Sequence, residues 1–167
     1  MIRAQDVQFQ LTRTFSAPVA QVFQMWTDVD HFAQWWGPKG FTVPVCKADF
    51  QVGGALLYCM KAPNGMEMWG KFVFQEIVPN QQIAFINYVT NENGEIMQMA
   101  HMPDWPLGII NDIRFEADGN HTILHFSAYP YEGNEKEWNA FDQGKNGLGK
   151  GFEGTFEKME TYLETLS

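Results

Sequence analysis

The chain has 167 residues, of which 45% are hydrophobic and 15% aromatic, so it is long enough to bury a substantial core in one domain. Its formal net charge of −9 disfavours a nucleic-acid partner, because Lys and Arg supply most of the affinity for phosphates. No stretch approaches the roughly 20 apolar residues that cross a bilayer, and the first residues lack the pattern of a signal peptide. We therefore expect a cytoplasmic protein with no membrane insertion.

The start of the chain predicts one strand followed by two short helices. Apolar and polar residues alternate over residues 7–15, which is typical of a strand with one buried face. Pro18 suits the first turn of a helix, and either Asp28 or Asp30 can cap a second helix. Gly37-Pro38 is expected to end that second helix.

Six further strands are predicted from alternating or continuous apolar runs that are bounded by Gly, Pro, Asn and Asp. The turns between most of them are short, so neighbouring strands should be antiparallel. The predicted ranges are 41–49, 55–61, 66–78, 82–90, 107–116 and 121–129. The intervening residues 91–106 are unusually rich in Met and Trp for a connection, which indicates that this loop covers something.

The last part of the chain predicts one long amphipathic helix over residues 135–166. Its apolar stripe consists of Phe141, Leu148, Phe152, Thr155, Met159, Leu163 and Leu166. Gly144, Gly147, Gly151 and Gly154 form a second stripe beside it, although glycine costs about 1 kcal/mol relative to alanine inside a helix. Three interpretations stay open: a gap that admits a ligand, close backbone packing, or a helix broken near residues 144–149.

This order of elements predicts an α+β fold in which a curved antiparallel sheet of six or seven strands wraps around the C-terminal helix. The segment FAQWWGPKGFT at residues 32–42, followed by Asp49 and Gly53-Gly54, resembles the WWGP and paired-glycine signatures of the activator-of-heat-shock-protein ATPase homologues. That family lies within the START-like superfamily, with polyketide cyclases and birch-pollen-allergen-like proteins. Residues 103–106 and 151–163 resemble later, looser segments of the family.

The resemblance spans nearly the whole chain and implies a helix-grip fold, with one START-like domain over residues 1–167 and an internal cavity. It does not imply one reaction, because members of the superfamily differ in activity. Trp35 and Trp36 are large apolar anchors before a chain reversal, so we interpret WWGP as a lid or corner. Gly53-Gly54 suits a tight turn or bulge, because no helix follows it to bind phosphate.

The predicted cavity is bounded by one face of the sheet, the 91–106 loop and the final helix. Its candidate ligand-binding residues are Tyr58, Met60, Met68, Phe72, Phe85, Asn87, Met102, Trp105, Asn111, Phe141, Lys145, Leu148 and Phe152. Tyr58, Asn87 and Asn111 are its polar groups, and each could instead be a satisfied core residue. Lys145 could meet an anionic or carbonyl-bearing ligand, or extend to water. Met102 and Trp105 are expected to close the entrance.

Our leading hypothesis is that the protein binds a small hydrophobic molecule without catalysis. The alternative is an enzyme of the cyclase or lyase type that acts on an aromatic or polyketide-like substrate, with proton transfer by Glu67, His101 or Tyr58. The resemblance also implies a third hypothesis, a partner that stimulates a chaperone ATPase. An exposed sheet edge permits a homodimer.

No metal or cofactor is predicted, because Cys46 and Cys59 stand outside any CxxC or Cys/His cluster. We expect both cysteines to be reduced, buried packing residues. His121 and His125 are expected on the solvent side of their strand.

Overall fold

The computed structural model describes residues 3–167 and contains seven strands, three α-helices and one short 3₁₀ helix. In chain order the elements are η1 (Ala4–Val7), β1 (Phe9–Phe15), α1 (Val19–Thr27), α2 (Val29–Trp35), β2 (Thr42–Ala48), β3 (Ala55–Lys61), β4 (Glu67–Val78), β5 (Gln82–Thr90), β6 (Gly108–Asp118), β7 (His121–Tyr131) and α3 (Glu135–Thr165). The six strands predicted after residue 40 are confirmed, each within two residues of its expected ends.

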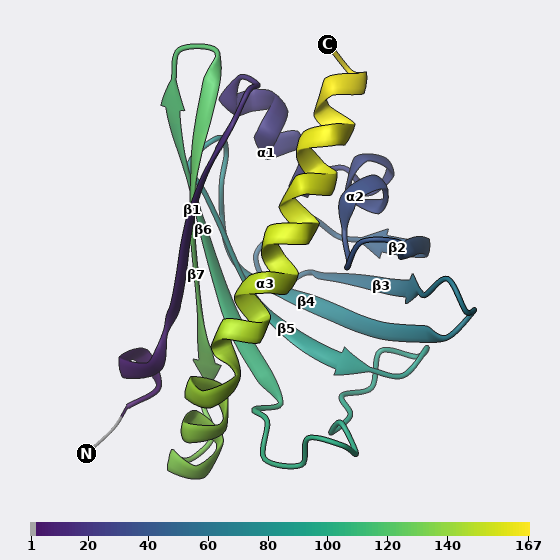
Figure 1. Ribbon diagram of the computed structural model, residues 1–167, viewed down its shortest axis with the longest axis vertical. Helices are drawn as coiled ribbons and strands as arrows, with labels where there is room; N and C mark the ends of the chain where they lie inside the picture. Colours follow the sequence, from purple (N-terminus) through teal and green to yellow (C-terminus); the bar gives the residue numbers. More distant parts are fainter. Residues whose placement is uncertain (1–2) are drawn as a thin grey trace.

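The strands form one antiparallel sheet in the order β1-β7-β6-β5-β4-β3-β2. The sheet is strongly curved, and α3 crosses its concave side with α1 and α2 beside the C-terminal half of the helix (Figure 1). This is the helix-grip fold that was expected. Strands β2 to β7 follow one another as a meander, and β1 pairs with the last of them, β7, so the first and last strands of the chain are neighbours.

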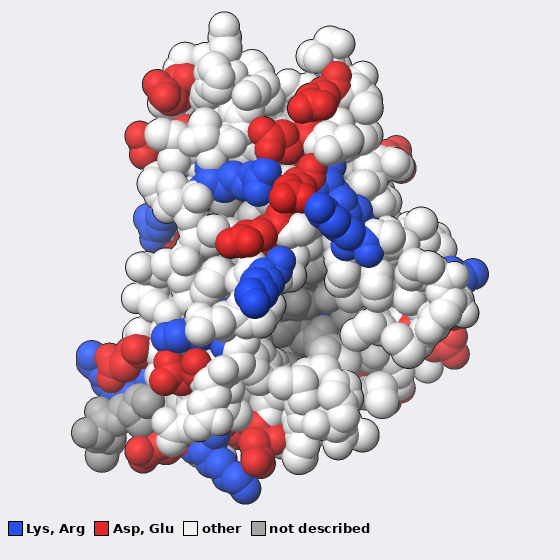
Figure 2. All heavy atoms as spheres, viewed as in Figure 1, with Lys and Arg blue, Asp and Glu red and all other residues white. Residues whose placement is uncertain are grey.

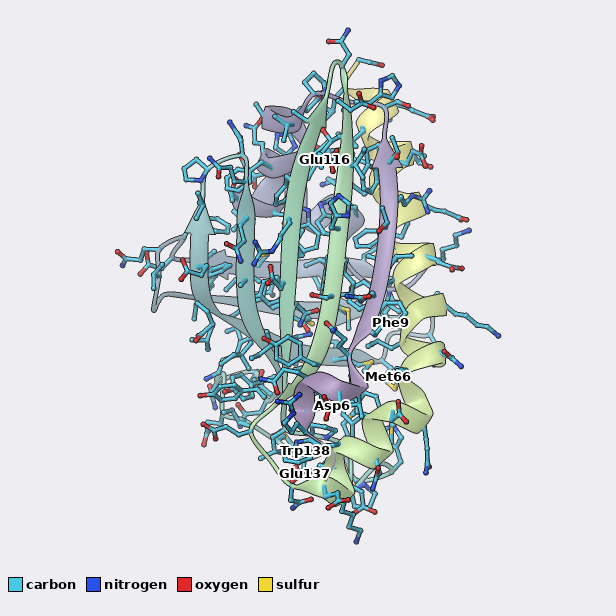
Figure 3. The ribbon with its side chains drawn as sticks, turned by 90° about the vertical axis from the view of Figure 1, so that its left-hand side faces the viewer. Asp6, Phe9, Met66, Glu116, Glu137 and Trp138 are labelled. Atoms are coloured by element: carbon cyan, nitrogen blue, oxygen red, sulfur yellow. The ribbon has the colours of Figure 1, made fainter. Side chains whose placement is uncertain are left out.

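The first strand begins later than the sequence predicts. Val7 was expected to lie in it, but belongs to η1, where the Asp6 carboxylate accepts a hydrogen bond from the backbone N–H of Arg3 at 2.9 Å. Val7 is nevertheless almost fully buried. Figure 3 shows η1 beside the first turns of α3, and η1 also contacts β7. Packing of η1 against α3 and β7, rather than strand pairing, explains the apolar residue at this position.

The two short helices place an aromatic cluster at the centre of the core. Asp28 caps α2 by accepting hydrogen bonds from the backbone N–H groups of Asp30 and His31, so the first of the two expected caps is the one used. The indole of Trp35 is fully buried and donates to the backbone carbonyl of Met25 at 3.1 Å. The WWGP segment is therefore an anchored corner of the core.

The C-terminal helix is continuous over 31 residues, so its glycines do not break it. Asn134 caps its start by accepting a hydrogen bond from the backbone N–H of Glu137 at 3.0 Å. Its fully buried residues include Phe141, Phe156 and Met159. Leu166 was expected to end the buried stripe, but this residue lies beyond the helix and is 40% exposed.

A half-buried lysine ties this helix to the corner that follows α2. The Nζ atom of Lys158 donates to the backbone carbonyls of Trp36, Gly37, Pro38 and Phe41 at 3.2 to 3.3 Å. Burial lowers the pKa of Lys158, whereas the four carbonyl dipoles favour its charged form. The side chain thereby fixes the backbone of residues 36–41 against α3.

Replacement of Lys158 by methionine should lower the free energy of unfolding by about 2 kcal/mol, because the corner's carbonyls lose a charged donor. Lys150→Met, on an exposed position of the same helix, is the matched control and should change stability by less than about 0.5 kcal/mol. Urea denaturation of the three proteins measures the difference. Equal losses in both variants would contradict the role given to Lys158.

Candidate functional site

An open pocket lies between α3 and strands β3 and β5, and Figure 2 shows it as a hollow beside the helix. Its volume is ≈ 360 Å³, within the range of about 300 to 1,000 Å³ that is usual for small-molecule sites. This main pocket is lined by Trp36, Gly37, Pro38, Tyr58, Met60, Asn87, Val89, Gly147, Leu148, Gly151, Phe152 and Thr155.

A second, smaller pocket of ≈ 110 Å³ adjoins the main pocket. Both share Asn87, Val89, Leu148 and Phe152, so they form neighbouring parts of one depression. The other residues of this side pocket are Tyr88, Trp105, Pro106, Leu107, Ile109 and Asn111. Among residues 3–167, no Asp, Glu, Lys, Arg or His lines either pocket, so the depression offers apolar surface and uncharged polar groups.

Four of the five glycines of α3 fall into two groups, and the fifth, Gly154, is in ordinary contact with Lys39. A Cβ atom at Gly147 or Gly151 would meet nothing within 4 Å, and both residues line the main pocket. In contrast, a Cβ at Gly144 would lie 2.7 Å from Trp105, and one at Gly149 would lie 2.6 Å from Phe9. Figure 3 shows Phe9 on β1 next to the helix. The gap and the close packing that the sequence left as alternatives therefore both occur, at different turns.

The polar centre of the main pocket is a tyrosine–asparagine pair. The Tyr58 hydroxyl donates to Asn87 Oδ1 at 3.1 Å. Tyr58 reaches this position because β4 has Gly70 opposite it, where a Cβ atom would lie 2.3 Å from the hydroxyl oxygen. Burial raises the pKa of Tyr58 to about 12. Tyr58 is therefore a neutral phenol at physiological pH.

A second asparagine lies on the adjacent strand. Asn111 of β6 is 2% exposed, and its Nδ2 atom donates to the backbone carbonyl of Ile109 at 3.0 Å. Ile109 pairs with Asn87 across β5 and β6, so the two asparagines are diagonal neighbours on one face of the sheet. Both line the side pocket.

The structure brings together more than half of the residues that the sequence proposed for ligand binding. Those that line the depression are Tyr58, Met60, Asn87, Trp105, Asn111, Leu148 and Phe152. Phe72 and Phe85 lie beneath it in the core, with ring centroids 3.8 Å apart. Phe141 is fully buried against Trp105, with ring centroids 5.4 Å apart. These three phenylalanines support the pocket from behind.

The other proposed residues lie outside the pocket lining. Met68 and Met102 are 37% and 36% exposed, and only the end of the 91–106 loop, at Trp105 and Pro106, reaches the depression. The Nζ atom of Lys145 lies 2.7 Å from the carboxylate of Asp142 on the same helix.

The residues considered for proton transfer are dispersed. Glu67 contacts the Cys59 thiol at 3.6 Å, and within residues 3–167 it makes no hydrogen bond to His101. His121 and His125 are exposed, as expected. Cys59 is buried and Cys46 only partly so, and both are free thiols. Burial raises the pKa of Cys59 to about 11.

Several lining residues were not proposed from the sequence. Val89 could have been found by alternation, because it follows Asn87 by two positions on the same face of β5. Gly147 and Gly151 belong to the glycine stripe that the sequence already offered as a gap for a ligand, and Thr155 follows four residues later on the same face of α3. Trp36 was interpreted as an anchor only, but it is both an anchor and part of the pocket wall.

Two features are absent from the part of the chain that the structure describes. Among residues 3–167, no three His, Cys, Asp or Glu side chains group as metal ligands. Over the same residues, no helix has the length and apolar character needed to span a membrane.

Residues 16–164 match the model of a family described as "Activator of Hsp90 ATPase homolog 1-like protein". The chain is also similar in fold to a solution structure from Arthrobacter aurescens, with a TM-score of 0.80, 20% identity and coverage of 99% of this chain and 90% of that one. The crystal structure of Ms6760 from Mycobacterium smegmatis gives a TM-score of 0.75 at 20% identity, covering 96% and 93%. That of the AHSA1 protein from Silicibacter pomeroyi gives 0.71 at 18%, covering 96% and 99%. A comparison with curated proteins finds no match.

The two groups of helix glycines should respond oppositely to alanine. Gly147→Ala and Gly151→Ala should each stabilise the fold by about 1 kcal/mol, because alanine favours the helix and its methyl group enters open space. Gly144→Ala and Gly149→Ala should be at least about 1 kcal/mol less stable than these, since Trp105 or Phe9 must move. Thermal and urea denaturation provide the comparison. A uniform gain in all four variants would contradict the division.

Alkaline pH should destabilise the protein partly through Tyr58. Its pKa in the folded protein is about 12, above the unfolded value of about 10, so its stabilising contribution is complete below pH 10 and is lost as the pH rises toward 12. Between pH 9 and pH 12, the free energy of unfolding of Tyr58→Phe should therefore fall by about 2 to 3 kcal/mol less than that of the wild type. Urea denaturation across this range measures the loss. Parallel curves for the two proteins would show that Tyr58 ionises normally.

Proposed function

This chain belongs to the activator of Hsp90 ATPase homolog 1-like family, and we propose that it binds a small, uncharged, largely apolar molecule in the main pocket. The family's fold is compatible with a ligand between sheet and helix, but the proposal is carried by this chain's own residues. Gly147 and Gly151 keep open the space between α3 and the sheet.

These two glycines support a retained space on energetic grounds. Each glycine costs about 1 kcal/mol of helix stability relative to alanine. At neither position does a neighbouring protein group occupy the space that a Cβ atom would fill. Gly144 and Gly149, by comparison, accommodate aromatic rings. A ligand that packs against the bare backbone at Gly147 and Gly151 would account for glycine at both positions.

The chemistry of the lining supports an apolar ligand without a formal charge. Met60, Leu148 and Phe152 give hydrophobic contact, and burial of a comparable apolar group contributes roughly 1.5 to 3 kcal/mol. Met60 and its flexible thioether can adapt to different ligand shapes. An ionised ligand would lose hydration here without gaining an opposite charge.

The geometry favours binding over the cyclase or lyase hypothesis. The high pKa of Tyr58 makes it a weak proton donor near neutral pH, where efficient acid–base groups have a pKa close to the working pH. Glu67 and His101 do not line either pocket. Binding requires only the shape and apolar surface that the pocket provides.

A leucine at position 151 should fill the pocket and remove binding. In a fluorescence titration with the neutral probe N-phenyl-1-naphthylamine, we expect the wild type to bind and Gly151→Leu to bind at least about tenfold more weakly. The variant should stay folded, because a side chain at this position enters open space.

Lys150→Leu is the matched control, because it adds a leucine to an exposed position of the same helix. It should leave the affinity unchanged. Equal affinity in the wild type and Gly151→Leu would place the probe elsewhere on the protein, and absence of binding by the folded wild type would refute the proposed function.

A further inference from the structure

The two asparagines in the depression have opposite orientations. The Tyr58 hydroxyl donates its proton to Asn87 Oδ1 at 3.1 Å. With its oxygen occupied, the Asn87 amide leaves its NH₂ group for the pocket.

Asn111 is oriented the other way. Its NH₂ group is used by the backbone carbonyl of Ile109, so its Oδ1 atom is the free end. Over residues 3–167 the structure gives no hydrogen bond to Asn111 Oδ1 or from Asn87 Nδ2, and none between the two side chains. A free donor and a free acceptor thus lie on neighbouring strands in the wall of the side pocket, and Asn87 also lines the main pocket.

A ligand that fills the depression takes both groups out of contact with water, and leaving them unpaired is then costly. Asn111 is 2% exposed and Asn87 is partly exposed, and the indole N–H of Trp36 in the pocket wall is buried with no partner in the described chain. Diagonal neighbours across an antiparallel pair lie about 7 to 8 Å apart, with their Cβ atoms somewhat closer, so one small polar group can contact both amide ends. A group that accepts from Asn87 and donates to Asn111 would satisfy both.

We infer that the ligand carries a neutral carbonyl beside an N–H or O–H donor, as in a carboxamide, and that Asn87 Nδ2 binds the carbonyl while Asn111 Oδ1 binds the donor. This inference rests on the proposed function and specifies the polar group of its ligand. The apolar body then lies in the main pocket against Leu148 and the bare helix backbone at Gly151. A carboxylate is excluded from this role because it has no donor for Asn111 and brings an unpaired charge.

Four naphthalenes of similar size test the inference by isothermal titration calorimetry. 2-Naphthamide offers both groups, 2-acetylnaphthalene only the acceptor, 2-isopropylnaphthalene neither, and 2-naphthoate a charge. The amide should bind about tenfold more tightly than the hydrocarbon, with the ketone between them and the naphthoate weakest, since one neutral hydrogen bond is worth about 2- to 12-fold in affinity.

Variants separate the two contacts. Asn87→Leu should remove the advantage of both the amide and the ketone, whereas Asn111→Leu should reduce the amide to the level of the ketone. Asn139→Leu, an exposed position of α3 outside both pockets, is the control and should preserve the order. In the wild type, the side-chain NH₂ resonances of Asn87 should shift with the amide and the ketone but not with the hydrocarbon, which tests the contact even if a variant fails to fold.

The outcomes distinguish this inference from the proposed function. If the hydrocarbon binds as tightly as the amide, or the NH₂ resonances of Asn87 do not respond, the inference is wrong while the pocket still binds apolar molecules. If none of the four compounds binds, both are wrong. Preferential binding of the naphthoate would overturn the uncharged class of ligand.

Discussion

The hold of Lys158 on the corner at residues 36–41 is the contact on which the depression depends. One ammonium group gathers four backbone carbonyls, and Thr155 on the preceding turn donates to the Gly37 carbonyl at 3.0 Å. These contacts fix where Trp36 stands relative to α3. Because Trp36 also packs edge-on against Phe72 and Tyr58 of the sheet, the corner acts as a spacer between helix and strands.

The helix is held close to the sheet on one side only. On the β1 side, Arg13 pairs with Glu160, and Phe9 fills the space over Gly149. Toward β3 and β5 the curvature carries the strands away from α3, and the depression occupies that separation. The same helix therefore has a packed side and an open side. Gly149 lies on the packed side against Phe9, whereas Gly147 and Gly151 face the open side.

Sequence reasoning was strong where a periodic pattern has one structural solution. The strand ranges and the long helix followed from periods of two and 3.6 residues, and Tyr58, Asn87 and Asn111 were placed on one face by alternation alone. Prediction from the sequence was weaker where the outcome depends on a contact between residues far apart in the chain. Whether Gly144 meets a ring and Gly147 meets space depends on Trp105, which arrives from a loop far along the chain. Likewise, Met102 has the apolar character of a covering residue but lies exposed, because only the end of its loop turns inward.

The open side of the depression has a kinetic consequence. A molecule can enter beside α3 from solvent without displacing the helix or unfolding a strand, so its entry needs no slow structural rearrangement. The same aperture leaves part of a bound molecule in contact with water, and affinity then depends on the portion that is enclosed. For the proposed ligand, this geometry favours rapid exchange with solvent over long retention.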